Sequence, residues 1–269
     1  MEKLITFKIE SDFALFKKPD INEVYLTYNL PPKPLLLGIF GAILGLKGLK
    51  HQYEKGEKYP EYYGKLKHWR TGIKPLGNFP FNKIINEYNS KNSYFGSAKY
   101  ENITIQEQLL IRPKYQIFVL SDNEDSLFNK FVSLLNGNKV IFMPYMGKNE
   151  FVLKISDFEK IGNFEDIENF EKGKIDSIFL HKPINKEEKK ESKEGLDSKE
   201  FYVEGEGLLD EKEGWGFEFY ENFPIGFDKN MQYNLFKIKY TNKEVEKKEL
   251  LFEEFSRILK IKDKIVYFF

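Results

Sequence analysis

Cysteine is absent from this chain of 269 residues, and histidine is scarce, with three residues. Without cysteine there are no disulfides, no thiolate metal ligands and no cysteine nucleophile. His51, His68 and His181 do not form an H-E-x-x-H motif or a similar spacing, which argues against a zinc centre. No G-x-S-x-G motif is present either. We expect no metal and no other cofactor.

Long apolar runs are also missing. The longest covers residues 35–46, whereas a membrane-spanning helix needs about 20 apolar residues. The first residues lack the basic segment and apolar core of a signal peptide. We therefore predict a soluble, cytoplasmic protein that does not contact a membrane.

The net charge of zero hides an asymmetry between the two halves. Residues 1–119 hold 18 lysines and arginines against 11 acidic residues, a balance of +7, and residues 120–269 hold 24 against 31, a balance of −7. Such asymmetry indicates that one half faces a polyanion, although chance in a lysine-rich chain gives the same picture. Arg70 and Arg112 are of interest because the guanidinium fork suits phosphates better than a lysine does.

Alternation and helical periodicity predict the order of elements in the N-terminal part. The expected order is a strand in "KLITFKIES", a helix from about Pro34, a strand in "HWRTGIKPL", a polar excursion over 78–110, a strand in "RPKYQIFVLSD", a helix capped by Asp125 or Ser126 and ending at Gly137, and a strand in "KVIFMPY". This is the β-α-β-β-α-β ferredoxin-like arrangement, which the RNA-recognition motif shares. We predict an α+β fold.

The first helix carries Gly38, Gly41 and Gly45 on one face. Each glycine costs a helix about 1 kcal/mol relative to alanine, so a close approach must compensate. We expect this helix to be buried tightly against a sheet. The spacing matches no nucleotide-binding loop.

The pattern changes after about residue 155. Short strands separated by glycine and proline turns follow, and they predict a β-rich C-terminal region over 156–269 beside an N-terminal domain over 1–155. Residues 185–200 are highly charged, with Leu196 as their one large apolar residue, which predicts a mobile loop. Residues 244–260 are expected to form a short amphipathic helix, and "KIVYFF" a terminal strand.

Residues 47–74 combine eight basic and three acidic residues with interleaved aromatic ones. Cations for phosphates and flat rings for bases are what single-stranded RNA binding requires. A solvated surface whose tyrosines cover the core has the same composition, so both interpretations stay open.

His51 and His68, with Tyr53 and Lys67 nearby, could supply a base and an acid for metal-independent RNA cleavage. Each is more commonly a surface or packing residue.

A later segment, "MPYMGKNEF" (143–151), is a second candidate. Gly147 would let the backbone approach a phosphate closely, with Lys148 beside it. A simple turn has the same sequence.

The chain resembles a known family at four segments. These are "DFALFKKPD" (12–20), "LTYNLPPKPLLLGIFGAILGLKG" (26–48), "MPYMGKNEF" and, less specifically, "ENFPIGFDKNMQY" (221–233). They resemble the Cas family-five proteins, RAMP-superfamily subunits of type I CRISPR surveillance (Cascade) complexes, with a variant closest to subtype I-B. The resemblance is strongest over residues 3–155.

That resemblance implies a ferredoxin-like palm, a β-hairpin thumb from the excursion at 78–110 and a variable, β-rich C-terminal region. The family grips the repeat-derived 5′ handle of the CRISPR RNA, caps the filament of backbone subunits and docks the large subunit, so that target DNA is contacted indirectly. Most subtypes do not cut RNA. The subtype I-C relative does, with a Tyr, Lys and His set that has no clear counterpart here, and we expect no catalytic activity.

We expect the glycine-striped helix to present its N-terminus and the preceding loop to RNA, because free N–H groups there favour phosphate. The full expected RNA-binding set is Lys17, Lys18, Tyr28, Lys33, Lys47, Lys50, His51, His68, Trp69, Arg70, Lys74, Arg112, Lys148 and Asn149. Two alternatives remain: an endoribonuclease that processes precursor CRISPR RNA, and a protein-only scaffold subunit.

Overall fold

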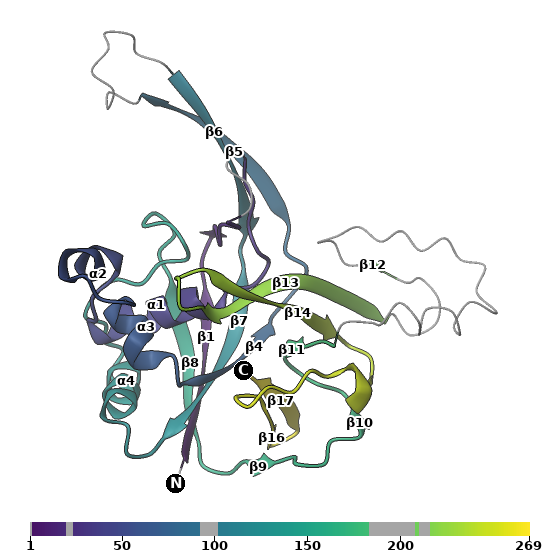
Figure 1. Ribbon diagram of the computed structural model, residues 1–269. Coiled ribbons are helices and arrows are strands. Elements are labelled where there is room, and N and C mark those ends of the chain that lie inside the picture. Colours follow the sequence, from purple (N-terminus) through teal and green to yellow (C-terminus); the bar gives the residue numbers. More distant parts are fainter. Residues whose placement is uncertain (1, 20–23, 92–101, 183–207, 210–215) are drawn as a thin grey trace.

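The computed structural model describes residues 2–19, 24–91, 102–182, 208–209 and 216–269, and shows a mixed α+β, strand-rich chain (Figure 1). A hairpin projects from the body at one end, and the C-terminal strands lie beside the N-terminal sheet. The predicted mobile loop at 185–200 lies outside the described residues.

The first sheet has four strands in the order β4-β7-β1-β8, and every neighbouring pair is antiparallel. Its strands and the helices of this part of the chain are β1 (Glu2–Glu10), α1 (Lys33–Leu44), α2 (Leu49–Lys55), α3 (Glu61–Leu66), β4 (Arg70–Pro75), β7 (Lys114–Asp122), α4 (Ser126–Asn136) and β8 (Lys154–Ile161). Helix α1 follows β1, and α4 follows β7. The predicted strands and helices at β1, α1, β4, β7 and α4 are confirmed.

Strand β1 lies between β7 and β8, and both of its faces are buried. Phe7 packs edge-on against Phe40 of α1 and Phe131 of α4, with ring centroids 6.0 Å apart in each case. On the other face, Leu4 belongs to an apolar cluster with Val266 from the C-terminal end of the chain. The alternation in this segment predicted a strand with one buried and one exposed face. In the structure both faces are buried, one against α1 and α4 and the other against the C-terminal residues.

The C-terminal hairpin of β16 (Arg257–Ile261) and β17 (Lys264–Phe268) packs on the face of the sheet opposite α1 and α4. A Cβ at Gly72 of β4 would lie 2.7 Å from a Val266 methyl group, so glycine permits this close approach. Strand β8 also runs across residue 155, so the N-terminal sheet extends beyond the expected domain boundary. The two regions share one packed core.

The excursion at 78–110 is mostly a long hairpin, not irregular chain. Strands β5 (Lys83–Lys91) and β6 (Asn102–Ile111) pair over their full length, and Figure 1 shows them extending away from the body. The short strands β2 (Phe13–Ala14) and β3 (Val24–Tyr25) add to β6 at the base of the hairpin. The hairpin expected from the resemblance is therefore present, and residues 92–101 lie outside the described part.

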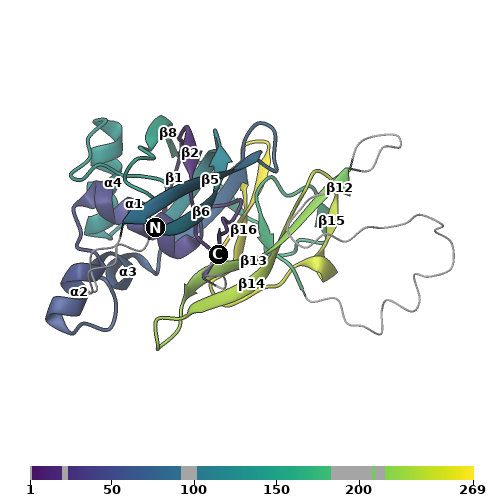
Figure 2. The same cartoon turned by 90° about the horizontal axis from the view of Figure 1, so that it is seen from above.

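The remaining C-terminal elements are short strands around one long pair (Figure 2). They are β9 (Glu165–Asp166), β10 (Lys172–Gly173), β11 (Phe179–Leu180), β12 (Leu208–Leu209), β13 (Phe217–Phe227), β14 (Tyr233–Thr241) and β15 (Val245–Glu246), with a 3-10 turn at Lys247–Glu249. The β-rich prediction is confirmed. The predicted helix at 244–260 is wrong: its two ends form β15 and β16, and only the 3-10 turn lies between them as helical structure.

The glycines of α1 face another helix, not a sheet as predicted. A Cβ at Gly41 would lie 2.4 Å from the Cβ of Tyr62 in α3, so α3 lies directly against this stripe. The predicted strand "KVIFMPY" is also wrong. Its Ile141 and Phe142 amides donate to carbonyls at the end of α1, and β8 takes the sheet position instead.

Among the described residues, no single helix is long and apolar enough to cross a membrane. Helices α1 and α2 reach the required length only together, and the chain bends by 87° between them.

Candidate nucleic-acid interface

Two sequence segments of the family resemblance, 12–20 and 143–151, meet at the base of the hairpin. The Leu15 amide donates to the Met146 carbonyl over 3.1 Å, and the rings of Phe13 and Phe151 lie 6.0 Å apart. Gly147 has a φ of 90°, and a Cβ there would lie 1.8 Å from the Leu15 carbonyl oxygen. The close approach that Gly147 permits is thus to the chain's own backbone, whereas the sequence suggested a phosphate.

Cations and rings gather beside this contact in what we call the hairpin-base cluster: Lys17, Tyr25, Tyr88, Glu107 and Lys148. Lys17 Nζ lies 3.5 Å from the centre of the Tyr25 ring. Lys148 Nζ donates to both Glu107 oxygens at 2.9 and 3.2 Å, and Tyr88 Oη donates to Oε1 at 3.2 Å. Glu107 is buried at 2% exposure, so its charge is compensated by Lys148.

Lys148 is consequently a fixed cation with limited freedom. Burial lowers its pKa, but the contacts with Glu107 outweigh this effect and leave the pKa above its ordinary value. Asn149 follows it in the turn and is exposed. Lys17 and Arg112 are also exposed, and neither has a carboxylate partner among the described residues.

A second basic surface lies at α2 and α3. A groove of about 480 Å³ there is lined by Lys47, His51, Glu57, Tyr59, Pro60, Glu61, Gly64 and Lys65. Glu61 accepts from Lys65 Nζ at 2.6 Å and from the Lys47 amide at 2.8 Å, and these two bonds lower its pKa. Glu61 thus neutralises Lys65, while Lys47 has no carboxylate partner within the described ranges. Lys50 is almost fully exposed, 3.9 Å from Glu54.

Residues 141–145 connect the two surfaces. Lys47 Nζ lies 5.9 Å from the centre of the Phe142 ring at one end, and Met146 binds Leu15 at the other. In Figure 1, α2 lies at the left of the sheet body and the hairpin projects from its top. The fold therefore brings Lys17, Lys47, Lys50, His51, Arg112, Lys148 and Asn149 of the expected set onto two adjoining surfaces.

Three residues of the expected set are buried and do not reach this surface. Trp69 packs among Phe128 and other rings, and its Nε1 donates to Asp125. Tyr28 is 2% exposed. Lys33 donates to the Phe269 carbonyl at 2.8 Å, and burial, followed by repulsion from Arg70, lowers its pKa to about 7. Tyr28 and Lys33 are buried because the C-terminal region encloses the start of α1, whereas Trp69 is buried between α1 and α4.

Lys18 has a structural partner. Its Nζ lies 3.0 Å from Oε1 of Glu221, a residue of β13 whose side chain is only 2% exposed. The Asn29 amide donates to the other Glu221 oxygen at 3.2 Å. Lys18 therefore compensates a buried carboxylate and is not a free phosphate ligand.

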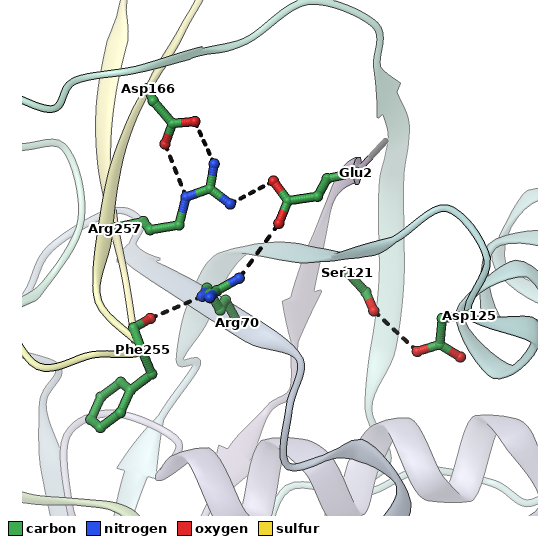
Figure 3. A network of polar contacts seen from close by, with 7 residues as sticks. All are labelled: Glu2, Arg70, Ser121, Asp125, Asp166, Phe255 and Arg257. Atoms are coloured by element: carbon green, nitrogen blue, oxygen red, sulfur yellow. Dashed lines mark hydrogen bonds and ion pairs between the residues drawn. The ribbon is translucent and has the colours of Figure 1, made fainter.

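Arg70 and Lys74 join β4 to the C-terminal region. Arg70 Nε donates to the Phe255 carbonyl at 3.0 Å, and its Nη1 lies 3.5 Å from Glu2, which also binds Arg257 (Figure 3). Lys74 Nζ donates to Asp176 at 2.7 Å. Both cations are thus held by internal partners, away from the hairpin-base cluster.

His68 is held by the residue that caps α4. Its Nε2 lies 2.9 Å from Asp125 Oδ2, while Oδ1 of Asp125 accepts from the Leu127 and Phe128 amides. Ser121 Oγ also donates to Asp125, as Figure 3 shows. Burial raises the pKa of Asp125, but its hydrogen bonds outweigh this and lower it, so the cap stays ionised.

Sequence reasoning missed Tyr25, Tyr88 and Glu107. Tyr88 lies in the polar excursion at 78–110, where the residue pattern was not used to predict a strand, and Glu107 is a charged residue whose burial no local pattern indicates. The alternation in "NITIQEQLLI" would have identified β6 as a strand.

No protein-family model matches the chain, and no curated protein matches its sequence. Several solved structures are similar in fold. A chain of a CRISPR RNA-guided surveillance complex is 13% identical, with 93% of this chain and 94% of that chain covered and a TM-score of 0.42. A CRISPR protein from Archaeoglobus fulgidus is 12% identical, with 99% and 98% covered and a TM-score of 0.43. A chain of the Type III-B Cmr-beta complex, bound to cognate target RNA and AMPPnP, is 11% identical, with 91% and 86% covered and a TM-score of 0.45. With scores this low we base no conclusion about this chain on them.

Proposed function

We propose that this chain is a non-catalytic, RNA-binding subunit of a type I CRISPR effector complex in the cytoplasm, close to subtype I-B. It holds the 5′ handle of the CRISPR RNA, caps the filament of backbone subunits and lies next to the large subunit. The observation that carries the proposal is the meeting of segments 12–20 and 143–151, which resemble the Cas family-five proteins, beside the cations and rings of the hairpin base.

The topology supports the same assignment. The strand order β4-β7-β1-β8, with α1 after β1 and α4 after β7, is the order that a ferredoxin-like palm requires. The hairpin of β5 and β6 takes the place of the thumb. Exposed lysines and tyrosines beside it are suited to an unpaired ribonucleotide chain.

The non-catalytic part of the proposal rests on the sequence, which holds no clear counterpart of the Tyr, Lys and His set of the subtype I-C relative. Incubation of the purified protein with precursor repeat RNA in EDTA tests this part. We expect the RNA to stay intact; discrete cleavage products would instead identify a metal-independent endoribonuclease.

Removing the free cations is expected to weaken RNA binding without unfolding the chain. Lys17→Gln, Lys47→Gln and Arg112→Gln combined remove three charges that have no carboxylate partner in the described part of the chain. Each lost phosphate contact flattens the logarithmic salt slope by about 0.7 for single strands, so the triple variant should lose roughly 2 in slope and about 10- to 100-fold in affinity near 0.15 M salt. Fluorescence titration of a handle-containing RNA at several salt concentrations measures both.

The matched control is Lys160→Gln, Lys174→Gln and Lys260→Gln. These substitutions remove the same charge from exposed lysines in β8, after β10 and in β16, elements that Figure 1 shows away from the projecting hairpin. The control should keep the wild-type slope. Equal slopes for the two triple variants would contradict the proposed site, and absence of RNA binding by the wild-type protein would favour the protein-only scaffold.

A further inference from the structure

Residues 140–145 expose an unusual amount of apolar side chain for a segment that sequence reasoning placed in a sheet. Ile141 is 48% exposed, Phe142 47%, Met143 64% and Tyr145 43%. Single exposed apolar side chains are common on protein surfaces, whereas several neighbouring ones usually mark a binding surface. The Phe142 ring lies beside Lys47 of the α2–α3 groove, and Tyr145 directly precedes Met146, whose carbonyl accepts from Leu15 at the hairpin base.

The strip is held rigidly at both ends. The Ile141 and Phe142 amides donate to the Ile43 and Ala42 carbonyls at 3.1 and 3.0 Å. The Met146 amide binds the carbonyl of Phe151 at 2.8 Å. Rings on a fixed backbone lose little conformational freedom on binding, which favours recognition of a flat partner.

Cations frame the strip. Lys47 approaches the Phe142 ring, Lys130 Nζ donates to the Leu44 carbonyl at the same helix end, and Lys139 and Lys148 precede and follow the rings in the chain. Lys148 is paired with the buried Glu107 and lies 3.9 Å from Glu150, so the positive charge of the frame comes from Lys47, Lys130 and Lys139. Exposed rings inside a frame of positive charge complement a polyanion that carries its own flat groups.

We propose that Phe142 and Tyr145, with Met143 between them, form a stacking platform for the bases of single-stranded RNA. The proposal rests on the RNA-binding function above and deepens it: the lysines hold phosphates, and the platform takes the bases. Stacking tolerates any base because each has a π-face, so the platform adds affinity without fixing a sequence.

The test compares two probes of equal length and charge: a labelled octauridylate and an eight-unit abasic ribose-phosphate oligomer. Wild-type protein should bind octauridylate about 10- to 100-fold more tightly, because one stacked base contributes roughly 5- to 150-fold. Phe142→Leu combined with Tyr145→Leu should remove about tenfold or more of octauridylate affinity and leave abasic affinity and the salt slope unchanged. Phe252→Leu with Phe255→Leu, which trims two exposed rings in the C-terminal region, is the matched control and should change neither.

The outcomes separate this proposal from the one it rests on. Equal wild-type affinity for both probes would overturn the platform and leave the phosphate-binding function standing. Binding of neither probe at low salt would overturn both. If the Leu variant keeps full octauridylate affinity but no longer joins its protein neighbours, the strip is a protein-docking surface and the platform is overturned.

Discussion

Gly147→Ala is expected to lower the free energy of unfolding by about 3–5 kcal/mol, a large effect for a substitution that only adds one methyl group. The added Cβ would lie 1.8 Å from the Leu15 carbonyl oxygen, and a φ of 90° disfavours any L side chain. The contact between segments 12–20 and 143–151 must therefore open. Differential scanning calorimetry should show a Tm lower by roughly 10 °C, since 1 kcal/mol corresponds to about 2–4 °C at this chain length.

Gly64→Ala is the control for this substitution. Gly64 lies in α3 with nothing within 4 Å of its would-be Cβ and an ordinary φ, so alanine should raise stability by about 0.5–1 kcal/mol. A Gly147→Ala protein that melts with the wild type would contradict the backbone contact at the hairpin base.

Lys18→Met is expected to destabilise the chain by about 3–5 kcal/mol at pH 7, because it leaves the buried Glu221 carboxylate without its main cation. The Asn29 amide and the more distant Lys83 would remain near that carboxylate. Urea unfolding of the single variant measures the loss. Adding Glu221→Gln removes the orphaned charge and should recover most of the stability, whereas a double variant no more stable than Lys18→Met would contradict the pairing.

The same pair predicts the direction of a pH effect. Burial raises the folded-state pKa of Glu221 above its ordinary value of 4.5, and Lys18 opposes that rise. A carboxyl with a raised folded pKa contributes stability below its unfolded pKa and loses it as pH rises through the folded value. Without Lys18 the folded pKa rises further. The deficit of Lys18→Met relative to wild type should therefore shrink as pH falls from 7 towards 5, which urea unfolding at each pH measures.

Local pattern predicted the elements whose signal lies within one segment. The Asp125 cap and the Gly137 exit bound α4 as expected, and alternation located β1 and β7. The strand expected at 139–145 failed because its apolar residues are exposed, and periodicity does not distinguish an apolar surface strip from a buried strand. The helix expected at 244–260 failed because strand pairing overrode local propensity.

The candidate site was predictable only in part, for a physical reason. Lys17 and Lys18 are neighbours in sequence, yet one contacts the half-buried ring of Tyr25 and the other compensates a buried carboxylate from β13. Lys33 is enclosed by the C-terminal end of the chain. Lys18, Lys33, Arg70 and Lys74 are each held by a partner that lies more than 100 residues away in sequence, which composition does not reveal.

Ultraviolet crosslinking of the protein to handle-containing RNA, with the crosslinked peptides identified by mass spectrometry, tests the central claim most directly. We expect crosslinks in residues 13–18, 47–53 and 141–151, the segments that form the two adjoining basic surfaces. Crosslinks confined to β16 and β17, or none while the protein is assembled with its neighbours and the RNA, would contradict the account.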